Sequence, residues 1–385
     1  MTDKTPTQGA AENLAVMSQA AMLDRLAAFP HYRTAAEAPA LRHAAQVQKL
    51  WGGTLRPMMA SRETKGRFAQ AALDCPPTAC TGYLEIAPHG QSQGWRNPDA
   101  IENIVCLEGR LEVRHGPSLD EHVSLGDFDM VSVPPHLRHQ LVNAGDTPVR
   151  LLSILSIEPG GTYDAIFTPD VQALLSADAQ RDLGLRLDDD PGLSIDAATM
   201  AARVTRAKEL VPYKAALSKT AAIPPQATEM LSAGSVYPLI VPEGHIGRSR
   251  TAPIYGFQGL YISIAECAPG DGDGPPPHAH SDTQESFLLL NGTWDIFTGF
   301  DNESVIHARP FDIVAMPNKV MRSFANTSDA PARLLVIIQG PDRMHDTVSF
   351  SRKIGAEVER RFGKETIAAY EKIRMTFDAE DRLQA

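Results

Sequence analysis

The chain has 385 residues and 43% hydrophobic residues, so it is long enough for two domains with cores of their own. Its formal net charge of −11 at pH 7 argues against nucleic acid and anionic membrane surfaces as partners. The four cysteines show no CxxC spacing, the first residues show no signal peptide, and no apolar run approaches a membrane span, so we expect a cytoplasmic protein with reduced thiols.

Residues 1–45 are predicted to form an N-terminal helical arm. Over residues 11–29, apolar residues recur at helical spacing and indicate an amphipathic helix that ends at Pro30. The apolar stripe consists of Leu14, Met17, Ala21, Met22 and Leu26. Such a stripe packs either on a domain of its own chain or on another subunit.

Two longer stretches have the pattern of β-domains. Residues 46–160 and 229–345 consist of short β-branched and aromatic runs punctuated by Gly and Pro. Helices are predicted for the linker at 161–228 and for the C-terminal segment at 346–385. The C-terminal helix has an apolar stripe of its own, at Val358, Phe362, Ile367, Tyr370 and Ile373. From the two stripes we expect a homo-oligomer, either a dimer or larger.

The two β-domains repeat one another. Three blocks of the first recur in the second at one constant offset, with no gap between them. The paired blocks are residues 102–109 and 285–292, residues 128–134 and 311–317, and residues 143–152 and 326–335. One offset shared by three blocks indicates an internal duplication, so we expect two tandem domains of the same fold.

The second domain has residue types and spacings that suit a metal. His278 and His280 are two positions apart on a predicted strand, so their side chains point the same way. Glu285 can meet them from the neighbouring strand. Two imidazoles and a carboxylate form the facial triad that suits a divalent ion and leaves positions open for dioxygen or substrate. The alternative is a surface loop with two chance histidines, but the further spacing to Gly292 favours metal binding.

This stretch resembles the first motif of the cupin superfamily, G-x5-H-x-H-x3,4-E-x6-G. The second motif, G-x5-P-x-G-x2-H-x3-N, follows in weakened form over residues 311–326, with Pro317 and Asn326 in place. The resemblance implies an all-β-dominated bicupin. Its two tandem cupin (double-stranded β-helix, jelly-roll) barrels would have N-terminal, inter-domain and C-terminal helices. Arg322 replaces the last histidine ligand of the family, and an arginine has no lone pair to offer a metal.

Two interpretations of Arg322 remain open. It either binds a substrate carboxylate or enolate oxygen beside the metal, or it neutralises Glu285 in a barrel without a metal. Alternation along the strands places Phe287 on the face of Glu285, and Phe324 and Asn326 on the face of Arg322. These four residues, Arg322, Phe324, Asn326 and Phe287, are the predicted substrate-binding residues.

The N-terminal barrel has diverged at the same positions. The offset places Trp95 and Asn97 opposite the two histidines, whereas Glu102 and His139 keep the residue types of the motifs. One His and one Glu rarely hold a metal alone, so we expect a degenerate site with His139 in the core or at its rim. The alternative is a second small-molecule pocket, with Trp95 for stacking and His139 for hydrogen bonding.

Within the superfamily, the architecture is diffusely similar to aromatic ring-cleaving (gentisate-type) cupin dioxygenases. That similarity rests on tandem barrels with helical arms and on Thr81, Gly126, Asp127, Phe128, Pro134, His139 and Asn143. The resemblance implies an Fe(II) dioxygenase for a small aromatic or dicarbonyl carboxylate, with His278, His280 and Glu285 as ligands. The alternatives are a non-redox decarboxylase, isomerase or lyase with Mn(II), and a small-molecule binder without a metal.

Overall fold

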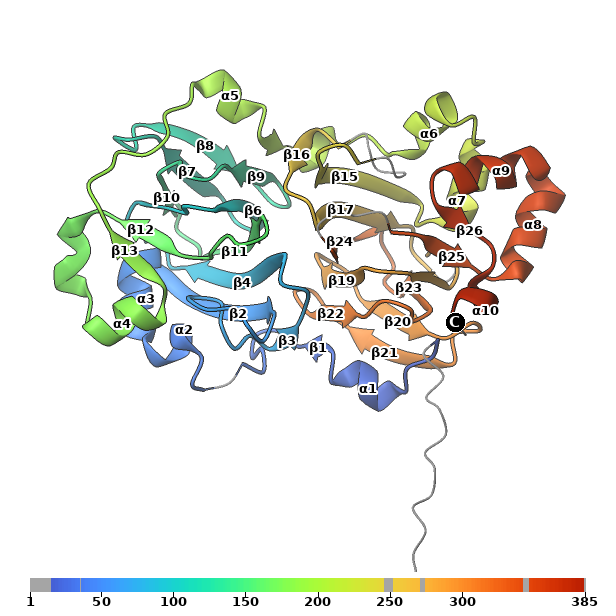
Figure 1. The fold of residues 1–385 in the computed structure, drawn as a ribbon, viewed down its shortest axis with the longest axis horizontal. Helices are drawn as coiled ribbons and strands as arrows, with labels where there is room; N and C mark the ends of the chain where they lie inside the picture. The colour runs from blue at the N-terminus through green and yellow to red at the C-terminus, as the bar shows by residue number, and fades with distance from the viewer. Residues whose placement is uncertain (1–14, 35, 246–251, 271–273, 342–345, 384–385) are drawn as a thin grey trace, which may run out of the picture.

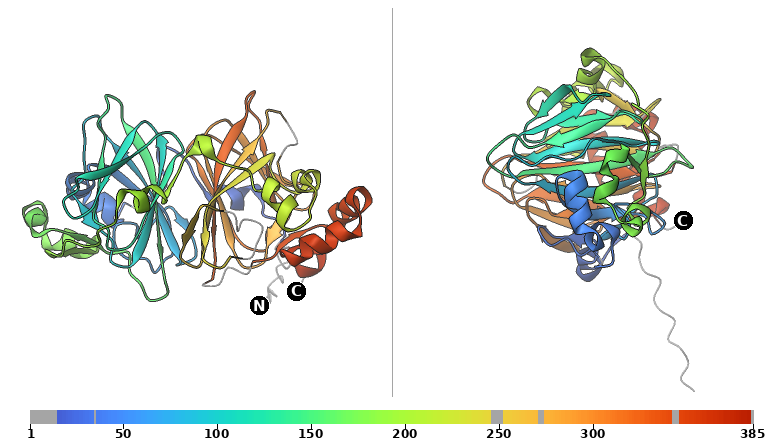
Figure 2. Two further views of the ribbon diagram at one scale, coloured as in Figure 1. Left: turned by 90° about the horizontal axis from the view of Figure 1, so that it is seen from above. Right: turned by 90° about the vertical axis from the view of Figure 1, so that its left-hand side faces the viewer.

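The computed structural model describes residues 15–34, 36–245, 252–270, 274–341 and 346–383. The two halves of the chain form two β-barrels that lie side by side (Figure 1). Each barrel consists of one seven-stranded and one six-stranded sheet, and the two sheets of each barrel are inclined to one another when seen from above (Figure 2). The predicted pair of tandem jelly-roll barrels is confirmed.

The N-terminal barrel contains the following strands in the order in which they pair. Its seven-stranded sheet consists of β14 (Val204–Thr205), β9 (Met130–Val133), β6 (Ala100–Glu108), β11 (Val149–Ile157), β4 (Ala79–Ile86), β2 (Gly53–Ala60) and β3 (Leu73–Asp74). Its six-stranded sheet consists of β13 (Leu185–Leu187), β12 (Ala165–Phe167), β5 (Trp95–Arg96), β10 (His139–Val142), β7 (Leu111–His115) and β8 (Glu121–Leu125).

The C-terminal barrel repeats this arrangement strand by strand. Its seven-stranded sheet consists of β1 (Leu26–Ala27), β22 (Ile313–Met316), β19 (Gln284–Leu289), β24 (Ala332–Gln339), β17 (Leu260–Cys267), β15 (Ser235–Pro242) and β16 (Ile254–Gly256). Its six-stranded sheet consists of β21 (Ser304–Ala308), β20 (Trp294–Thr298), β23 (Arg322–Asn326), β18 (His278–His280), β25 (Val348–Phe350) and β26 (Met375–Thr376).

The strand registers confirm the duplication. Glu102 pairs with Val133 in the first barrel, and Glu285 pairs with Met316 in the second. Val133 and Met316, like the two glutamates, are separated by the same number of residues as the repeated sequence blocks. Trp95 pairs with His139, and His278 pairs with Arg322, again at that offset. The four positions of each site are therefore equivalent in the two barrels.

The helices are shorter than the sequence predicts. They are α1 (Gln19–Leu23), α2 (Pro39–Arg42), α3 (Ala44–Trp51), η1 (Pro169–Leu174), α4 (Ala177–Asp182), α5 (Ala197–Ala201), η2 (Ala207–Glu209), α6 (Lys214–Thr220), α7 (Pro225–Leu231), α8 (Arg352–Phe362), α9 (Lys364–Lys372) and α10 (Ala379–Arg382). None of the helices in the described ranges is long and apolar enough to cross a membrane.

The prediction of one helix over residues 11–29 is wrong. Among residues 15–29, only α1 is helical, and the chain then extends as β1, because Leu26 and Ala27 satisfy the backbone of the edge strand β22. Met22 is fully buried in the C-terminal barrel, and Leu26 packs against the same core. Leu14 lies outside the described residues.

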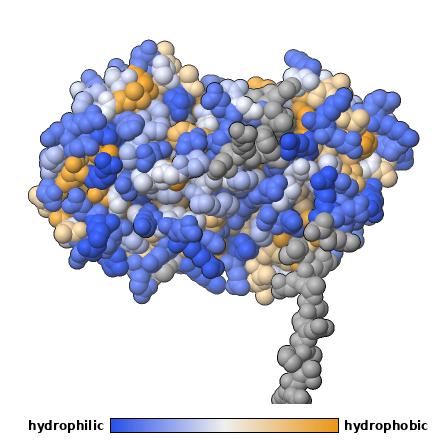
Figure 3. All heavy atoms as spheres, viewed as in Figure 1, coloured by the Kyte–Doolittle hydropathy of each residue, from blue (hydrophilic) through white to orange (hydrophobic). Residues whose placement is uncertain are grey.

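The C-terminal segment is also divided. Gly363 has a φ of 87° and separates α8 from α9, since a positive φ is open to glycine and breaks the helix. The stripe residue Val358 is fully buried, and Phe362 and Ile367 pack against its cluster within the same chain. On the face in Figure 3, hydrophobic residues are scattered. The large described residues of both stripes therefore pack within the chain, and the homo-oligomer remains a prediction.

Three main hydrophobic clusters hold the molecule together. One fills the N-terminal barrel and another the C-terminal barrel. The third lies between the barrels, where residues of the two seven-stranded sheets such as Leu152, Ile154, Ile262 and Leu335 come together. A smaller cluster joins α7, β25, β26, α8 and α9 and covers one end of the C-terminal barrel.

Candidate metal centre

The structure brings the three predicted metal ligands together inside the C-terminal barrel. His278 and His280 lie on β18 and Glu285 lies on β19. Their ligand atoms all lie within 4.8 Å of one another. The Nε2 atom of each histidine is 3.5 Å from Oε2 of Glu285. All three side chains are buried, so the group is an interior cluster and the chance surface loop is excluded.

Hydrogen bonds on the outer ring nitrogens orient both imidazoles. Nδ1 of His278 lies 3.0 Å from the carbonyl oxygen of Pro276, and Nδ1 of His280 faces the carboxylate of Asp346. Both acceptors require Nδ1 to carry the proton, which leaves a lone pair on each Nε2. Burial also lowers the pKa of His278, so this ring is neutral near pH 7. The two lone pairs face Glu285.

Asp346 is a site residue that the sequence did not reveal. Besides His280, it accepts hydrogen bonds from Thr283 Oγ1 at 2.8 Å, the Asp282 amide at 3.0 Å and Ser281 Oγ at 3.1 Å. Burial would raise its pKa, but the interaction with His280 and the hydrogen bonds from the Asp282 amide and Thr283 outweigh burial and leave the pKa lowered. Asp346 is therefore an anionic partner that fixes the ring of His280. The equivalent position of the first repeat is a tyrosine, so the repeat gives no signal for it.

Arg322 lies beside the ligands in a fully buried position. Its Nε atom is 3.4 Å from Oε2 of Glu285, and its Nη2 donates a 3.0 Å hydrogen bond to the carbonyl of Pro317. Burial lowers the pKa of Arg322. Burial would raise the pKa of Glu285, but His280, His278 and Arg322 together leave it well below its usual range. Glu285 is thus ionised and has a cation at its side.

Four buried polar atoms at this point have no hydrogen-bond partner: His280 Nε2, Glu285 Oε2, Arg322 Nε and Arg322 Nη1. Buried polar atoms are nearly always paired, so a convergence of unpaired ones calls for an explanation. The two lone-pair atoms suit a cation, and the two guanidinium donors suit an anionic oxygen. The residue set therefore fits a divalent metal with an oxygenated anion next to it.

A narrow cavity of about 50 Å³ reaches His278 and Glu285. Phe324 lines it, whereas Phe287 packs edge-on behind Phe324 at a ring distance of 5.1 Å. Asn326 has a different role from the predicted one. Its amide nitrogen donates to the carbonyls of Cys267, Ala268 and Ala330, so it anchors a turn and has no hydrogen left for a substrate.

In the N-terminal barrel, three of the predicted residues surround the fourth, Glu102, in a buried polar core. Asn97 and Trp95 donate to Oε2 of Glu102 at 2.7 and 3.2 Å. His139 Nε2 lies 3.3 Å from the same oxygen, and its ring is 4.2 Å from that of Trp95. All four side chains are buried. Here Glu102 has neutral donors where Glu285 has two histidines.

Arg67, which the sequence analysis missed, completes this core. Its Nη2 donates to Glu102 at 3.0 Å, and Ser153 donates to Oε1 at 2.6 Å. The guanidinium lies 5.1–5.6 Å from the rings of Trp51, Phe68 and Trp95, which are cation–π distances. Burial would raise the pKa of Glu102, but Arg67 and the other donors leave it lowered. The guanidinium of Arg67 thus supplies a positive charge next to Glu102 within the fold.

A repeat signal for Arg67 does exist in the sequence. Around Arg67, Met59 pairs with Leu73, and the counterparts of these two residues, Ile240 and Ile254, pair in the second domain. This offset leads from Arg67 to Arg248, although Arg248 lies outside the described residues. The signal is weak because Arg67 falls between strands, where no motif fixes the alignment. Loop residues that enter a barrel are the ones that strand patterns cannot find.

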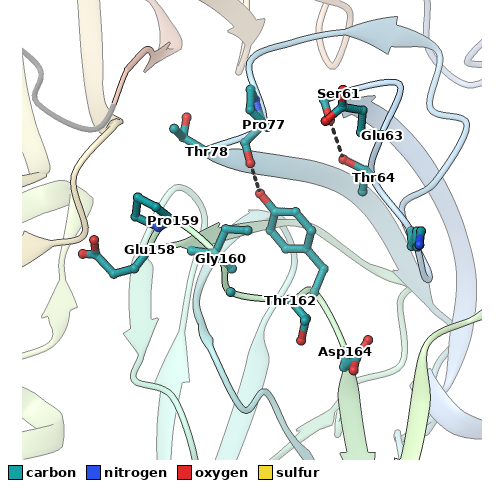
Figure 4. Close-up of a pocket in the computed structure, with 14 residues that line it drawn as sticks. Ser61, Glu63, Thr64, Pro77, Thr78, Glu158, Pro159, Gly160, Thr162 and Asp164 are labelled. Atoms are coloured by element: carbon teal, nitrogen blue, oxygen red, sulfur yellow. Dashed lines mark hydrogen bonds between the residues drawn. The ribbon is translucent and has the colours of Figure 1, made fainter.

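A larger hollow of about 430 Å³ lies on the outside of the N-terminal barrel, between residues 61–65 and 157–164 (Figure 4). Tyr163 closes its floor by donating a 2.7 Å hydrogen bond to the carbonyl of Pro77. None of the predicted site residues lines it. It is a surface feature separate from both barrel interiors.

Comparisons with known proteins agree with this architecture. The Cupin domain family matches twice, over residues 82–155 and 263–338. No curated protein sequence matches the chain.

Solved structures with a similar fold include vicilin from Corylus avellana (hazelnut), at 11% identity, 78% of this chain, 88% of that chain and a TM-score of 0.43. Oxalate decarboxylase from Bacillus subtilis is 14% identical, covers 70% of this chain and 70% of its own, and has a TM-score of 0.42. A point mutant of salicylate 1,2-dioxygenase from Pseudoaminobacter salicylatoxidans is 12% identical, covers 68% of this chain and 70% of its own, and has a TM-score of 0.41. At this level of similarity none of them assigns an activity to the chain.

Proposed function

The protein is a bicupin of the cupin superfamily, with one cupin domain in each half of the chain, and we propose that its C-terminal barrel is a divalent-metal centre that acts on a small oxygenated carboxylate. His278, His280 and Glu285 hold the metal, and Arg322 orients the substrate. The N-terminal barrel has a structural role, because Arg67 fills the equivalent space.

The observation that carries the proposal is the set of four unpaired buried atoms on His280, Glu285 and Arg322. A site that had lost its chemistry would be expected to pair its carboxylate internally, as the N-terminal barrel pairs both oxygens of Glu102 with Arg67 and Ser153, although His139 Nε2 and Arg67 Nε are unpaired there as well. The C-terminal site leaves Oε2 of Glu285 unpaired while Pro276 and Asp346 hold both histidine rings in place. Such prior orientation is what a metal centre requires.

Iron(II) is the metal we propose, because two histidines and one carboxylate on one face form the ligand set of non-haem oxygenases. Bound there, it would supply a Lewis-acidic redox centre with adjacent positions for an oxygenated substrate and dioxygen. Arg322 would hold the substrate carboxylate through its free Nε and Nη1 donors. Its burial excludes competing water and strengthens that contact.

The test is to load the purified chain anaerobically with Fe(II) or Mn(II) and to measure bound metal and oxygen uptake. We expect one metal per chain, and oxygen uptake with Fe(II) that depends on an added hydroxylated aromatic acid or dicarbonyl compound. Turnover with Mn(II) and no oxygen uptake would replace the oxygenase by a decarboxylase, isomerase or lyase. A chain that binds neither metal would be a metal-free binder, and the proposal would be wrong.

A further inference from the structure

The cavity above the C-terminal site has apolar walls. Strand β17 turns Tyr261, Ser263 and Ala265 toward it, at alternate positions, and β24 contributes Val336 and Ile338. Small side chains at Ser263 and Ala265 leave the space open. The wall opposite is formed by Phe324 and Pro275.

The roof of the cavity comes from α7 and from β25 and β26 at the edge of the six-stranded sheet. Leu231 and Ala233 at the end of α7, Val348 and Phe350 on β25, and Met375 on β26 close it. All five are buried. The roof is thus an apolar layer that shields a ligand from water, and the cavity of about 50 Å³ is well below the roughly 300–1,000 Å³ of pockets for drug-sized ligands. The ligand is therefore small.

Charged groups occur only at the inner end of this cavity. Among the described residues that line it, His278 and Glu285 are the only ionisable groups other than the phenols of Tyr213 and Tyr261, and no lysine or arginine is present. A carboxylate at the outer end would lose water without gaining a cation, which is costly. Arg322 does not line the cavity, but its Nε lies 3.4 Å from Oε2 of Glu285 at the inner end, and its Nε and Nη1 are unpaired, so a ligand carboxylate at the inner end would approach this guanidinium.

The N-terminal barrel shows what a closed version of this space looks like. Gly82 is the counterpart of Ser263, since Gly82 pairs with Ser153 and Ser263 pairs with Val336, and a Cβ atom at Gly82 would lie 2.0 Å from the ring of Phe68. Ser153, the counterpart of Val336, donates to Glu102. The N-terminal barrel therefore fills this space with Phe68 and Arg67, whereas the described residues of the C-terminal barrel leave a cavity there.

We propose that the ligand of the C-terminal barrel is a monocarboxylate with a small apolar body, such as one aromatic ring or a short aliphatic chain. Its carboxylate lies at Arg322 and the metal ligands, and its body lies between β17, β24 and the roof. The inference rests on the proposed metal centre and narrows its substrate class. It disfavours small dicarboxylates, whose second charge would fall among Val336, Ile338 and Phe350.

The experiment uses the full chain loaded with Co(II), whose visible absorption reports ligand binding without turnover. The probes are benzoate, butanoate, succinate and formate, and affinity is measured by calorimetry as well. Butanoate and succinate both have four carbons, so they differ only in the second carboxylate. We expect butanoate and benzoate to bind at least tenfold more tightly than succinate.

Two variants locate the apolar body. Ala265→Leu adds a branched side chain to the cavity and should weaken benzoate and butanoate at least tenfold, while formate, which has no body, should change less than twofold. Val336→Ser leaves room but makes the wall polar, and should weaken the same two probes several-fold. The matched control is Ile264→Val, on the same strand but facing the other barrel, and it should leave all four probes unchanged.

The outcomes separate the two proposals. If Co(II) does not bind, the proposed metal centre and the proposed monocarboxylate ligand are both wrong. If Co(II) binds at one per chain but succinate equals or exceeds butanoate, this inference falls and the metal centre stands. Equal weakening of formate and benzoate in both cavity variants would also overturn it, because the change would then lie at the metal ligands and not at the apolar walls.

Discussion

Glu102 and Glu285 show how one residue type at equivalent positions can have opposite roles. Glu102 accepts hydrogen bonds from Arg67, Asn97, Trp95 and Ser153, so its charge is used within the fold. Glu285 has an unpaired oxygen that faces two histidine lone pairs. The residue type alone does not distinguish them, because the difference lies in the partners that the loops and neighbouring strands bring.

The role of Arg322 is tested by two substitutions. Arg322→Lys should keep the bound metal and lose most activity, because a point charge cannot reproduce the directional donors of a guanidinium. Arg322→His should tighten metal binding without rescuing turnover. Metal content and activity are measured side by side. A wild type with little metal, together with a metal site newly created by Arg322→His, would show that Arg322 only neutralises Glu285.

Asp346 should act through His280. Asp346→Asn removes the charge that fixes the His280 ring, and the loss of such a partner typically weakens metal affinity about 10–100-fold. The affinity for Co(II) or Zn(II) is measured by competition with a chelator. Ser281→Ala is the control, since it removes a donor to Asp346 without touching His280. An unchanged affinity in Asp346→Asn would mean that Asp346 serves only to hold the turn at residues 281–283.

The pairing of Glu102 predicts a pH dependence of stability. Its pKa is held below the usual 4.5, so below pH 4.5 the unfolded chain takes up a proton that the folded chain does not. The free energy of unfolding then decreases as the pH is lowered, by up to about 1.4 kcal/mol per pH unit. Glu102→Gln lacks this titration but leaves Arg67 unpaired, at a cost of about 3–5 kcal/mol near pH 7. In urea titrations, the difference in unfolding free energy between wild type and Glu102→Gln should become smaller below pH 4.5. A difference that stays constant with pH would contradict a lowered pKa of Glu102.

At the scale of elements, the repeated Phe-Asp pair shows how far the sequence leads. Repetition of Phe128-Asp129 as Phe311-Asp312 helped to predict two barrels, and both phenylalanines have a positive φ, of 66° and 70°. The function of the aspartates was not predictable. Asp312 accepts the Phe29 amide at 2.8 Å, and Asp129 accepts the Ala207 amide at 2.9 Å. These partners are distant in sequence, and strand patterns carry no record of such pairs.

These two contacts reveal a reciprocal exchange of arms. The segment α1–β1 precedes the N-terminal barrel but pairs with β22 of the C-terminal barrel. The segment α5–β14 precedes the C-terminal barrel but pairs with β9 of the N-terminal barrel. Each arm is a short helix followed by a two-residue strand. Helical periodicity predicted a longer first helix because the register of Met22 and Leu26 fits both outcomes, and the strand edge decided between them.

The arm should stabilise the barrel that it contacts. Met22 is fully buried in the C-terminal core, so Met22→Ala should cost about 2–5 kcal/mol of unfolding free energy. Leu23→Ala is the matched control, because this neighbouring side chain is 47% exposed and should change stability by no more than about 0.5 kcal/mol. Urea denaturation measures both. Equal effects in the two variants would show that the arm does not contribute through its packing.

At the scale of the whole molecule, the exchanged arms and the cluster between the barrels make one unit. Residues of both seven-stranded sheets share that cluster. Each arm pairs with the edge of one barrel, and the chain after it continues into the other barrel (Figure 1). A single barrel would leave one apolar sheet face and one strand edge exposed. The duplication therefore supplies, within one chain, the contacts that two separate copies of a barrel would need from each other.

Because only the C-terminal barrel has the proposed metal ligands, we expect one metal per chain and not two. The N-terminal site has Trp95 and Asn97 in place of histidines, and Arg67 already neutralises Glu102. A divalent ion would have to displace that guanidinium from among Trp51, Phe68 and Trp95. His139→Ala should therefore leave the metal content unchanged, whereas the His278→Ala, His280→Ala pair should abolish it. Elemental analysis of the three proteins decides the matter: two metals per wild-type chain, or loss of half the metal in His139→Ala, would show that the N-terminal barrel still binds an ion despite its arginine.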